Sequence, residues 1–196
     1  MDAQFDLFGQ GAPAKIGPEG FGYTPDLLTL AQEADLAARL AELPFQPFAF
    51  HGHFGNRQVV TFGYRYDYDR RQVQEAAPIP DFVLEARAAV AAWAGRPADD
   101  FVQCLINRYA PGAGIGWHRD KPQFGTVAGI SLLAPCVMRL RLKQGDRWDR
   151  AGVPLAPRSA YLLTGPARTQ WEHSITPQAA LRYSITFRTL AEGAGG

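Results

Sequence analysis

The feature that most constrains the fold is a series of short apolar segments in the second half of the chain, each separated from the next by turn-forming residues. Five of these segments follow Asp100, at residues 101–109, 126–133, 136–142, 159–163 and 182–190. Segments of this length, with turn signals between them, are typical of the strands of a sandwich or a barrel. The high content of Pro (15) and Gly (20) agrees with a fold that has many turns. We therefore predict that this half of the chain is mainly β.

The first half of the chain adds helices and hairpins. Apolar residues recur at helical spacing over residues 25–43 and again over residues 80–93. A Pro-Asp pair opens each run, which suits a helix N-terminus. Residues 45–69, between the two runs, are aromatic and β-branched with interspersed glycines, which predicts hairpins. The expected fold class is therefore α+β, mainly β.

The length of 196 residues suits one domain with a full core. We expect residues 1–24 to form a mostly unpacked arm, residues 25–190 a single domain, and residues 191–196 a tail. The chain lacks an apolar run of the ~20 residues needed to cross a bilayer and has no visible secretory signal. We therefore expect a cytoplasmic monomer without a membrane partner. Cys104 and Cys136 lie inside apolar runs, which favours buried, reduced thiols.

Three residues have the chemistry of a metal site. His118 and Asp120 are two positions apart, so on an extended segment both point to the same face. His173, 53 residues beyond Asp120, supplies a third ligand. Two imidazoles and one carboxylate leave the other positions of an ion open, as in non-haem Fe(II) oxygenases. Zinc also accepts these ligands, and an isolated His-x-Asp pair is weak evidence, so the neighbouring motifs must decide.

Two arginines near the C-terminus indicate a bound anion. Arg182 and Arg188 are an even number of residues apart, so in a strand they lie on one face, with Ser184 and Thr186 between them. The opposite face carries apolar residues, namely Tyr183, Ile185 and Phe187. Two guanidinium groups inside a barrel are costly unless they meet anions, and guanidinium forks match carboxylates. A dicarboxylic co-substrate fits this face; the alternative is a solvent-facing edge strand.

Taken together, the motifs resemble the AlkB family of iron- and 2-oxoglutarate-dependent dioxygenases, which oxidatively demethylate nucleic acids. The resemblance spans roughly residues 45–190 and is carried by five motifs in order, at residues 105–113, 118–121, 130–132, 173–175 and 182–188. It implies a double-stranded β-helix, or jelly-roll, core that is preceded by helices and substrate-gripping hairpins. It also implies Fe(II) as cofactor, with 2-oxoglutarate and dioxygen as co-substrates.

The resemblance assigns roles residue by residue. The residues that it assigns to iron, and hence to catalysis, are His118, Asp120 and His173. The residues that it assigns to the 2-oxoglutarate pocket are Asn107, Tyr109, Arg182 and Arg188, with Ser131 as a weaker candidate. Arg182 would bind the distal carboxylate, while Arg188 would brace Asp120 or the proximal carboxylate. Because histidine ligands must be neutral, we expect iron affinity to fall below about pH 6.

The implied substrate is methylated DNA or RNA, with the target base flipped out of a duplex or already unpaired. Residues 57–63 resemble the family's Arg-x-x-x-x-Tyr-Gly pattern, with Phe62 in place of the Tyr. Arg57 is the expected phosphate contact, and Phe54, Tyr64 and Tyr66 are candidate stacking residues. The alternative for these aromatic residues is an ordinary place in the core of a sheet.

The identity of the substrate is left open by the sequence. Some relatives carry an acidic base-recognising residue two positions after the iron Asp, where this chain has Pro122. Repair of alkylated bases in DNA or RNA is the first hypothesis, and oxidation of tRNA modifications or protein side chains is the second. A third hypothesis is a protein that binds nucleic acid without catalysis. It does not explain why the chain has the three metal-ligand candidates and the two arginines, Arg182 and Arg188.

Two further segments point to partners. With a net charge of +1, binding of nucleic acid requires a local patch. Residues 137–143 alternate, so that Arg139, Arg141 and Lys143 share one face, with Arg147 and Arg150 nearby. This patch meets phosphates or is the solvated face of a strand. In the arm, the segment Gln4, Phe5, Asp6, Leu7 and Phe8 resembles the peptide by which bacterial repair proteins dock on the sliding clamp; the alternative is an arm that packs on its own domain.

Overall fold

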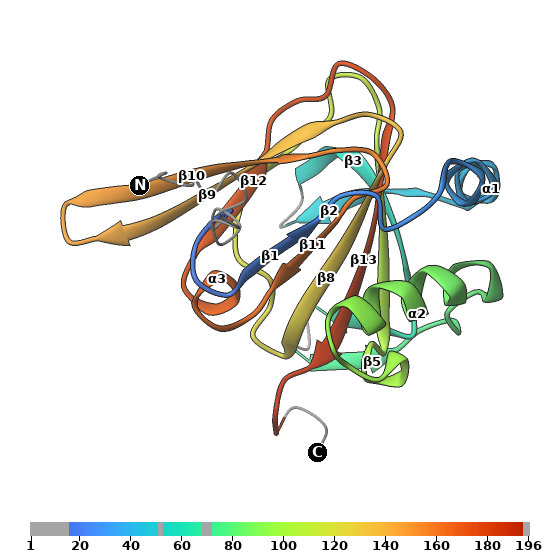
Figure 1. Cartoon of the computed structure of the whole chain (residues 1–196), viewed down its shortest axis with the longest axis horizontal. Coiled ribbons are helices and arrows are strands. Elements are labelled where there is room, and N and C mark those ends of the chain that lie inside the picture. Colours follow the sequence, from blue (N-terminus) through green and yellow to red (C-terminus); the bar gives the residue numbers. More distant parts are fainter. Residues whose placement is uncertain (1–15, 51–52, 68–71, 194–196) are drawn as a thin grey trace, which may run out of the picture.

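The computed structural model describes residues 16–50, 53–67 and 72–193, in which two antiparallel sheets face each other (Figure 1). The large sheet has, in spatial order, the strands β1 (Phe21–Thr24), β11 (Ala160–Leu163), β8 (Phe124–Leu132), β13 (Arg182–Leu190), β6 (Gln103–Tyr109), β3 (His53–Phe62) and β2 (Gln46–Phe50). The small sheet has β10 (Arg147–Leu155), β9 (Cys136–Gln144), β12 (Glu172–Ile175) and β7 (Ile115–His118). A separate hairpin pairs β4 (Tyr64–Asp67) with β5 (Gln72–Glu75).

Apart from the consecutive pairs β2–β3 and β9–β10, neighbouring strands in both sheets are distant in sequence. Strand β13, for example, pairs with β6 on one side and with β8 on the other. Buried side chains of both sheets, including Val127 and Leu163 of the large sheet and Met138 and Leu140 of the small one, form one apolar cluster between them. This arrangement confirms the predicted α+β, mainly β fold with a jelly-roll core.

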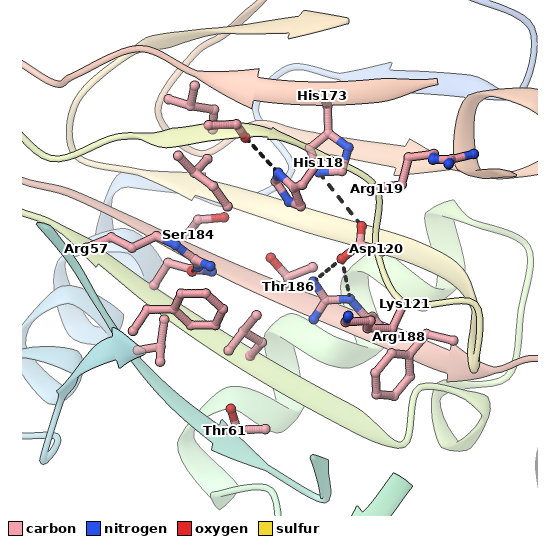
Figure 2. A pocket seen from close by; sticks show the side chains of 18 of the residues that line it. Arg57, Thr61, His118, Arg119, Asp120, Lys121, His173, Ser184, Thr186 and Arg188 are labelled. Atoms are coloured by element: carbon pink, nitrogen blue, oxygen red, sulfur yellow. Dashed lines mark hydrogen bonds and ion pairs between the residues drawn. The ribbon is translucent and has the colours of Figure 1, made fainter. Parts of the chain in front are cut away.

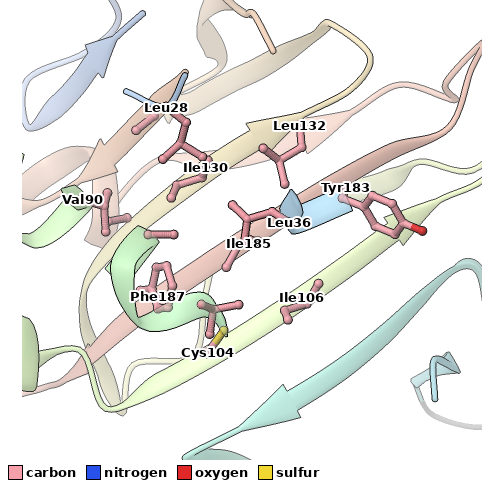
Figure 3. Close-up of a cluster of buried hydrophobic side chains, with 14 of the residues drawn as sticks. Leu28, Leu36, Val90, Cys104, Ile106, Ile130, Leu132, Tyr183, Ile185 and Phe187 are labelled. Atoms are coloured by element: carbon pink, nitrogen blue, oxygen red, sulfur yellow. The ribbon is translucent and has the colours of Figure 1, made fainter. Parts of the chain in front are cut away.

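Helices cover the outer face of the large sheet. They are α1 (Leu30–Ala41) and α2 (Leu84–Trp93), the latter preceded by the 3-10 turn Asp81–Val83 and followed by the 3-10 turn Ala98–Asp100. Leu36 and Val90 pack with Ile130, Ile185 and Phe187 in the larger apolar cluster (Figure 3). Full burial of one such side chain contributes about 1.5–3 kcal/mol, so this layer is a main source of stability.

Helix α1 begins later than the periodicity of the sequence predicts. The Thr29 side chain accepts a hydrogen bond from the backbone N–H of Gln32, whose side chain in turn accepts one from the Thr29 N–H. This capping box fixes the helix start at Leu30. Asp26, which we expected near the start, has a φ of 50° and so lies in the left-handed region outside the helix. The second predicted helix, over residues 80–93, is confirmed, since Asp81–Val83 and α2 are continuous.

We predicted that residues 1–24 form an unpacked arm, but the last four of them, Phe21–Thr24, form the edge strand of the large sheet. Residues Phe21–Thr24 pair with Ala160–Leu163, and Phe21 and Tyr23 pack against the inner cluster. Because of this pairing and this apolar contact, residues 21–24 are part of the packed sheet rather than of an arm. Residues 4–8, the predicted clamp-docking segment, lie outside the described part of the chain, and their role stays a prediction.

Three smaller observations complete the fold. Cys104 and Cys136 are buried free thiols, as predicted. Among the described residues, no helix has both the length and the apolarity that crossing a membrane requires. The short helix α3 (Gly165–Thr169), which the sequence pattern did not predict, lies between β11 and β12.

Candidate active site

A cavity of about 580 Å³ lies between the two sheets. Its walls come from β3, β6 and β13 of the large sheet, from β7 and β12 of the small one, and from the loop after β7. His118, Asp120, His173 and Arg188 point into it from different elements (Figure 2). The jelly roll thus brings together motifs that are up to 70 residues apart in sequence.

The strand pairing brings the two histidines together. Strands β12 and β7 are neighbours in the small sheet, and His173 lies directly opposite His118. Residues that face each other across an antiparallel pair project to the same side, and the centroids of these two rings are 4.2 Å apart. Asp120 follows two positions after His118, and its Oδ2 lies 3.8 Å from His173 Nε2. The three predicted ligands therefore share one wall of the cavity.

His118 is oriented by the backbone. Its Nδ1 lies 2.9 Å from the carbonyl oxygen of Gly116. Because a carbonyl only accepts, Nδ1 must carry the proton, which leaves the lone pair of the neutral ring on Nε2. Metal-binding histidines are commonly held by such a contact on their second nitrogen. The tautomer of His118 thus suits a ligand that binds through Nε2.

The electrostatics of the site keep both histidines neutral and the aspartate ionised. Burial lowers the pKa of His173 to about 3, with the neighbouring His118 adding to the effect, and burial likewise lowers the pKa of His118. For Asp120, burial alone would raise the pKa, but the positive charge of Arg188 and of other nearby groups outweighs it and the pKa lies well below its ordinary value. These are the protonation states that metal ligands need.

The donor set fits iron, although its side chains are not closed around one point. In the described part of the chain, no three His, Cys, Asp or Glu side chains already meet the geometry of an ion site. Asp120 is held by Arg188, whereas His118 contacts Gly116 beside it. Binding of an ion therefore requires these side chains to draw closer, and the chemistry of two neutral imidazoles and one carboxylate suits Fe(II).

Arg182 has the properties of a carboxylate receptor. It is completely buried, and its Nε donates a hydrogen bond of 3.1 Å to Ser131 Oγ. The guanidinium carbon lies 5.2 Å from the centroid of the Tyr109 ring. Both terminal nitrogens of Arg182 are buried, and neither has a hydrogen-bond partner among the described residues. A buried guanidinium with two unsatisfied nitrogens is costly, and a carboxylate would satisfy both at once.

Arg57 lies deeper in the site than the sequence predicted. Only 7% of its surface is exposed, its NH1 donates a hydrogen bond to Asn107 Oδ1, and its guanidinium stacks on the Phe48 ring, 4.0 Å from the centroid. Both Arg57 and Asn107 line the cavity. This position suits contact with a small bound group within the cavity better than the expected contact with an external phosphate.

Two of the three predicted stacking residues, Tyr66 and Tyr64, lie in different surroundings. Tyr66 lines the cavity, and Lys121 Nζ lies 5.0 Å from the centroid of its ring. Tyr64 is half-buried and is not among the residues that line the cavity. Phe54 lies in β3, but its side chain is outside the described part of the structure. The position of Tyr66 supports a role in stacking, while Tyr64 and Phe54 stay predictions.

Two features of the site gave no signal in the sequence. Arg168 of α3 is buried and donates hydrogen bonds to four backbone carbonyls of the segment that follows His118, those of Asp120, Lys121, Phe124 and Gly125. Tyr161 lies flat on Gly129, where an added Cβ would come within 2.3 Å of the ring, and burial raises its pKa to about 12. Both act through tertiary contacts, which spacing in the sequence does not reveal.

Comparison with known proteins identifies the family of the chain. A model of the 2OG-Fe(II) oxygenase superfamily matches residues 20–188. The chain is 35% identical to tRNA (carboxymethyluridine(34)-5-O)-methyltransferase alkbh8 of Xenopus tropicalis over 130 residues, which are 63% of this chain and 20% of the frog protein. It is 32% identical to α-ketoglutarate-dependent dioxygenase AlkB of Escherichia coli K12 over 155 residues, 70% of this chain and 68% of that protein.

The fold has solved counterparts as well. The structure of OsALKBH1 superimposes with a TM-score of 0.66 at 19% identity and covers 89% of this chain and 99% of its own. This likeness concerns the fold alone. The first curated relatives are longer proteins, of which the chain spans 20%, 52% and 20%.

The fold, the site and the matching model define the class: the chain belongs to the 2OG-Fe(II) oxygenase superfamily. Within that superfamily, the match to E. coli AlkB places it in the AlkB family, as the sequence motifs predicted. Membership confirms the predicted class of enzyme, a dioxygenase, and its predicted requirements, Fe(II), 2-oxoglutarate and dioxygen. It also favours iron over zinc as the metal.

Proposed function

We propose that this protein oxidatively demethylates N-alkylated bases in DNA or RNA, with iron held by His118, Asp120 and His173. The observation that carries the nucleic-acid part is the charge of the cavity. Among the described residues, five cationic side chains line it, namely Arg57, Arg65, Arg119, Lys121 and Arg188, against the one carboxylate of Asp120. Such a lining favours a polyanionic substrate, and the volume of about 580 Å³ is of the size that binds a small molecule or a single base.

The co-substrate pocket is proposed around Arg182. Its two unpartnered terminal nitrogens would bind the distal carboxylate of 2-oxoglutarate, with Ser131 holding Nε and Tyr109 alongside. Asn107 lies on the adjoining strand, where it is hydrogen-bonded to Arg57. These contacts would place the keto-acid end of the co-substrate toward the triad, because Arg182 and Arg188 lie at opposite ends of the same strand face.

Iron, 2-oxoglutarate and dioxygen together supply the oxidising power when bound. In the overall reaction the N-methyl group leaves as formaldehyde, the base keeps a hydrogen in its place, and 2-oxoglutarate is converted to succinate and carbon dioxide. The protein keeps His118 and His173 neutral and Asp120 ionised, and it orients the carboxylate through Arg188. The target base must be unpaired or flipped out to enter the cavity.

Oxidation of a tRNA modification is the second candidate, because the frog relative's name describes an enzyme acting on tRNA. The test is mass spectrometry of methylated single-stranded DNA, duplex DNA and tRNA after incubation with the iron-loaded protein, 2-oxoglutarate and dioxygen. We expect methyl loss from an oligonucleotide, with one formaldehyde and one succinate formed per methyl group removed. Methyl loss or hydroxylation confined to tRNA would establish the second candidate.

The control is His118→Ala, which should abolish both succinate and formaldehyde formation. Turnover of 2-oxoglutarate by this variant at the wild-type rate would contradict the metal assignment. Turnover by the wild-type protein with every nucleic acid left unchanged would contradict the proposed substrate and would direct the search to protein side chains.

A further inference from the structure

The outer face of the small sheet, on the opposite side from the iron ligands, carries a regular array of cations and tryptophans. In the pairing of β9 with β10, Lys143 lies opposite Trp148 and Arg141 lies opposite Arg150. In the pairing of β9 with β12, Arg141 also lies opposite Glu172. Residues opposed in this way share a face. We call the array the basic ladder; it consists of Trp117, Arg139, Arg141, Lys143, Trp148 and Arg150.

The centre of the basic ladder is stacked. The guanidinium of Arg141 lies between two tryptophans, 4.4 Å from the ring centroid of Trp117 and 4.3 Å from that of Trp148. Arg139 lies over Trp117 at 5.0 Å, and Arg141 Nε donates a hydrogen bond of 2.6 Å to Glu172. Stacking and this ion pair hold the guanidinium groups in place before any ligand arrives. A receptor ordered in advance loses little conformational entropy when it binds an anion.

The charge of the basic ladder is unbalanced. Four cations share a face with one carboxylate, that of Glu172, because strand alternation places Asp149 on the other side. Lys143 and Arg150 are exposed. Like charges directly opposite each other, such as Arg141 and Arg150, destabilise a sheet. Sheet stability alone therefore does not explain this surface, whereas a polyanion bound along it would.

The basic ladder is continuous with the active site. Strands β7 and β12 carry His118 and His173 on their inner faces and contribute Trp117 and Glu172 to the outer face. Trp117 lines the cavity as well as stacking with the two arginines, and the exposed Arg119 beside it also lines the cavity. The β9–β10 hairpin extends from the body of the molecule (Figure 1), so a long ligand can follow it to the cavity.

We propose that the basic ladder binds the backbone of a single-stranded nucleic acid and leads the strand to the cavity. Its pattern of cations interleaved with tryptophans is suited to a single strand, because phosphates meet the cations while unpaired bases stack on the accessible part of the half-buried tryptophan rings. The inference extends the proposed function by giving its substrate a path outside the cavity. Binding along this path requires neither iron nor 2-oxoglutarate.

The test is binding of an unmodified, fluorescein-labelled 20-nucleotide oligothymidylate to the full chain, without iron, followed by fluorescence anisotropy at several salt concentrations. For single strands, log K falls with log[salt] with a slope of about −0.7 per neutralised phosphate. We therefore expect Arg150→Gln to reduce the magnitude of the slope by about 0.7, and Lys143→Gln with Arg150→Gln to reduce it by about 1.4. Trp148→Ala should weaken binding about fivefold or more.

The matched control is Arg147→Gln. Arg147 is an exposed arginine of the same strand, β10, but it lies opposite Gln144 and so belongs to the other face. It should keep the wild-type slope. A double variant with the wild-type slope, or an equal reduction in the control, would overturn the proposal. A DNA duplex of the same length that competes as well as the single strand would overturn its single-strand part.

The outcome is separable from that of the proposed function. A smaller salt slope in Arg150→Gln, together with no demethylation by the wild-type protein, would support the ladder and contradict the demethylase. If the wild-type protein demethylates its substrate but the substitutions of Lys143 and Arg150 leave its affinity for the oligonucleotide unchanged, the demethylase is supported and the ladder is contradicted.

Discussion

Arg188 binds Asp120 through two nitrogens that reach the same oxygen: Nε and NH2 lie 3.1 and 2.6 Å from Oδ1. The other oxygen, Oδ2, is left facing His173 Nε2 at 3.8 Å. Gln103 accepts a further hydrogen bond of 2.9 Å from Arg188 NH1, so the guanidinium is itself held in place. Of the two roles expected for Arg188, this geometry supports the bracing of Asp120 over contact with the proximal carboxylate.

We predict that Arg188→Lys weakens metal binding about 10- to 100-fold, because a lysine cannot reproduce the fork that orients Asp120. The measurement is calorimetric titration of the apoprotein with Mn(II), in the absence of 2-oxoglutarate. Arg182→Lys, on the same strand face but without contact to Asp120, is the matched control and should leave the Mn(II) affinity unchanged. Equal affinities of wild type and Arg188→Lys would show that Asp120 needs no brace.

A second prediction concerns the unsatisfied nitrogens of Arg182. Replacing a buried, incompletely paired charge with an apolar side chain of similar volume is often neutral or stabilising by about 1–4 kcal/mol. We therefore expect Arg182→Met to unfold at the same temperature as the wild-type apoprotein or higher, yet to lose the stabilisation that 2-oxoglutarate confers in the presence of Mn(II). Thermal unfolding with and without the co-substrate measures both effects.

Ser131→Ala is the control that perturbs Arg182 without removing its charge. It removes the acceptor of Arg182 Nε and leaves the two terminal nitrogens in place, so it should reduce the response to 2-oxoglutarate without abolishing it. If Arg182→Met still responds to 2-oxoglutarate like the wild type, the carboxylate binds elsewhere.

The parts of the fold that the sequence predicted are those in which local pattern and tertiary structure agree. The alternation over residues 182–188 placed Arg182 and Arg188 on one face and Ile185 on the other, and the structure has the arginines in the interior between the sheets and Ile185 under the helices. Alternation works here because β13 is central in the large sheet and buried on both sides.

Other parts of the structure were missed, each for a different reason. The start of α1 was set by the Thr29–Gln32 capping box rather than by the Pro-Asp pair before it. Strand β10 was missed because most of its side chains are exposed, so its sequence contains no apolar run. Arg57 was expected to contact a phosphate, and its burial was not foreseen because its partner, Asn107, is 50 residues away in sequence. Only the burial of Arg57 depends on a partner outside the window in which a pattern is read, because Thr29 and Gln32 are three residues apart.

Arg168 leads to a third prediction. Its guanidinium donates to four carbonyls between Asp120 and the start of β8, at 2.5 to 3.3 Å, and a methionine would remove these hydrogen bonds, leaving the Lys121 carbonyl with the one from the Phe124 N–H. Because an unsatisfied buried polar group costs about 1–3 kcal/mol, Arg168→Met should lower the free energy of unfolding by at least that amount. We also expect faster amide hydrogen exchange over residues 121–126, which mass spectrometry of the apoprotein would resolve.

The matched control for Arg168 is Arg119→Met. Arg119 is exposed and donates one long hydrogen bond, of 3.4 Å, to the Thr169 carbonyl. Its replacement should change the free energy of unfolding by no more than about 0.5 kcal/mol. A similar loss of stability in the two variants would mean that Arg168 has no special part in holding the segment after Asp120.

The last prediction concerns the dependence of the free energy of unfolding on pH. Burial lowers the pKa of His173 to about 3, whereas in the unfolded chain it is close to 6.5, so between these values the unfolded state binds more protons. Stability must therefore fall as the pH decreases through this window, by about 1.4 kcal/mol per pH unit for each such histidine. Asp120, whose lowered pKa lies below an unfolded value of about 3.9, stays ionised in both states over most of this window.

Urea unfolding of the apoprotein between pH 4.5 and 7.5 measures this slope, and His173→Gln isolates the contribution of one histidine. The variant should have a shallower dependence on pH than the wild type, by about 1.4 kcal/mol per unit below pH 6. The same shift revises the expectation for iron. In the folded protein His173, the proposed ligand, stays neutral well below pH 6, so proton competition for it begins at a lower pH than the free imidazole value implies. Identical slopes for variant and wild type would mean that His173 titrates in the folded protein as it does in the unfolded chain.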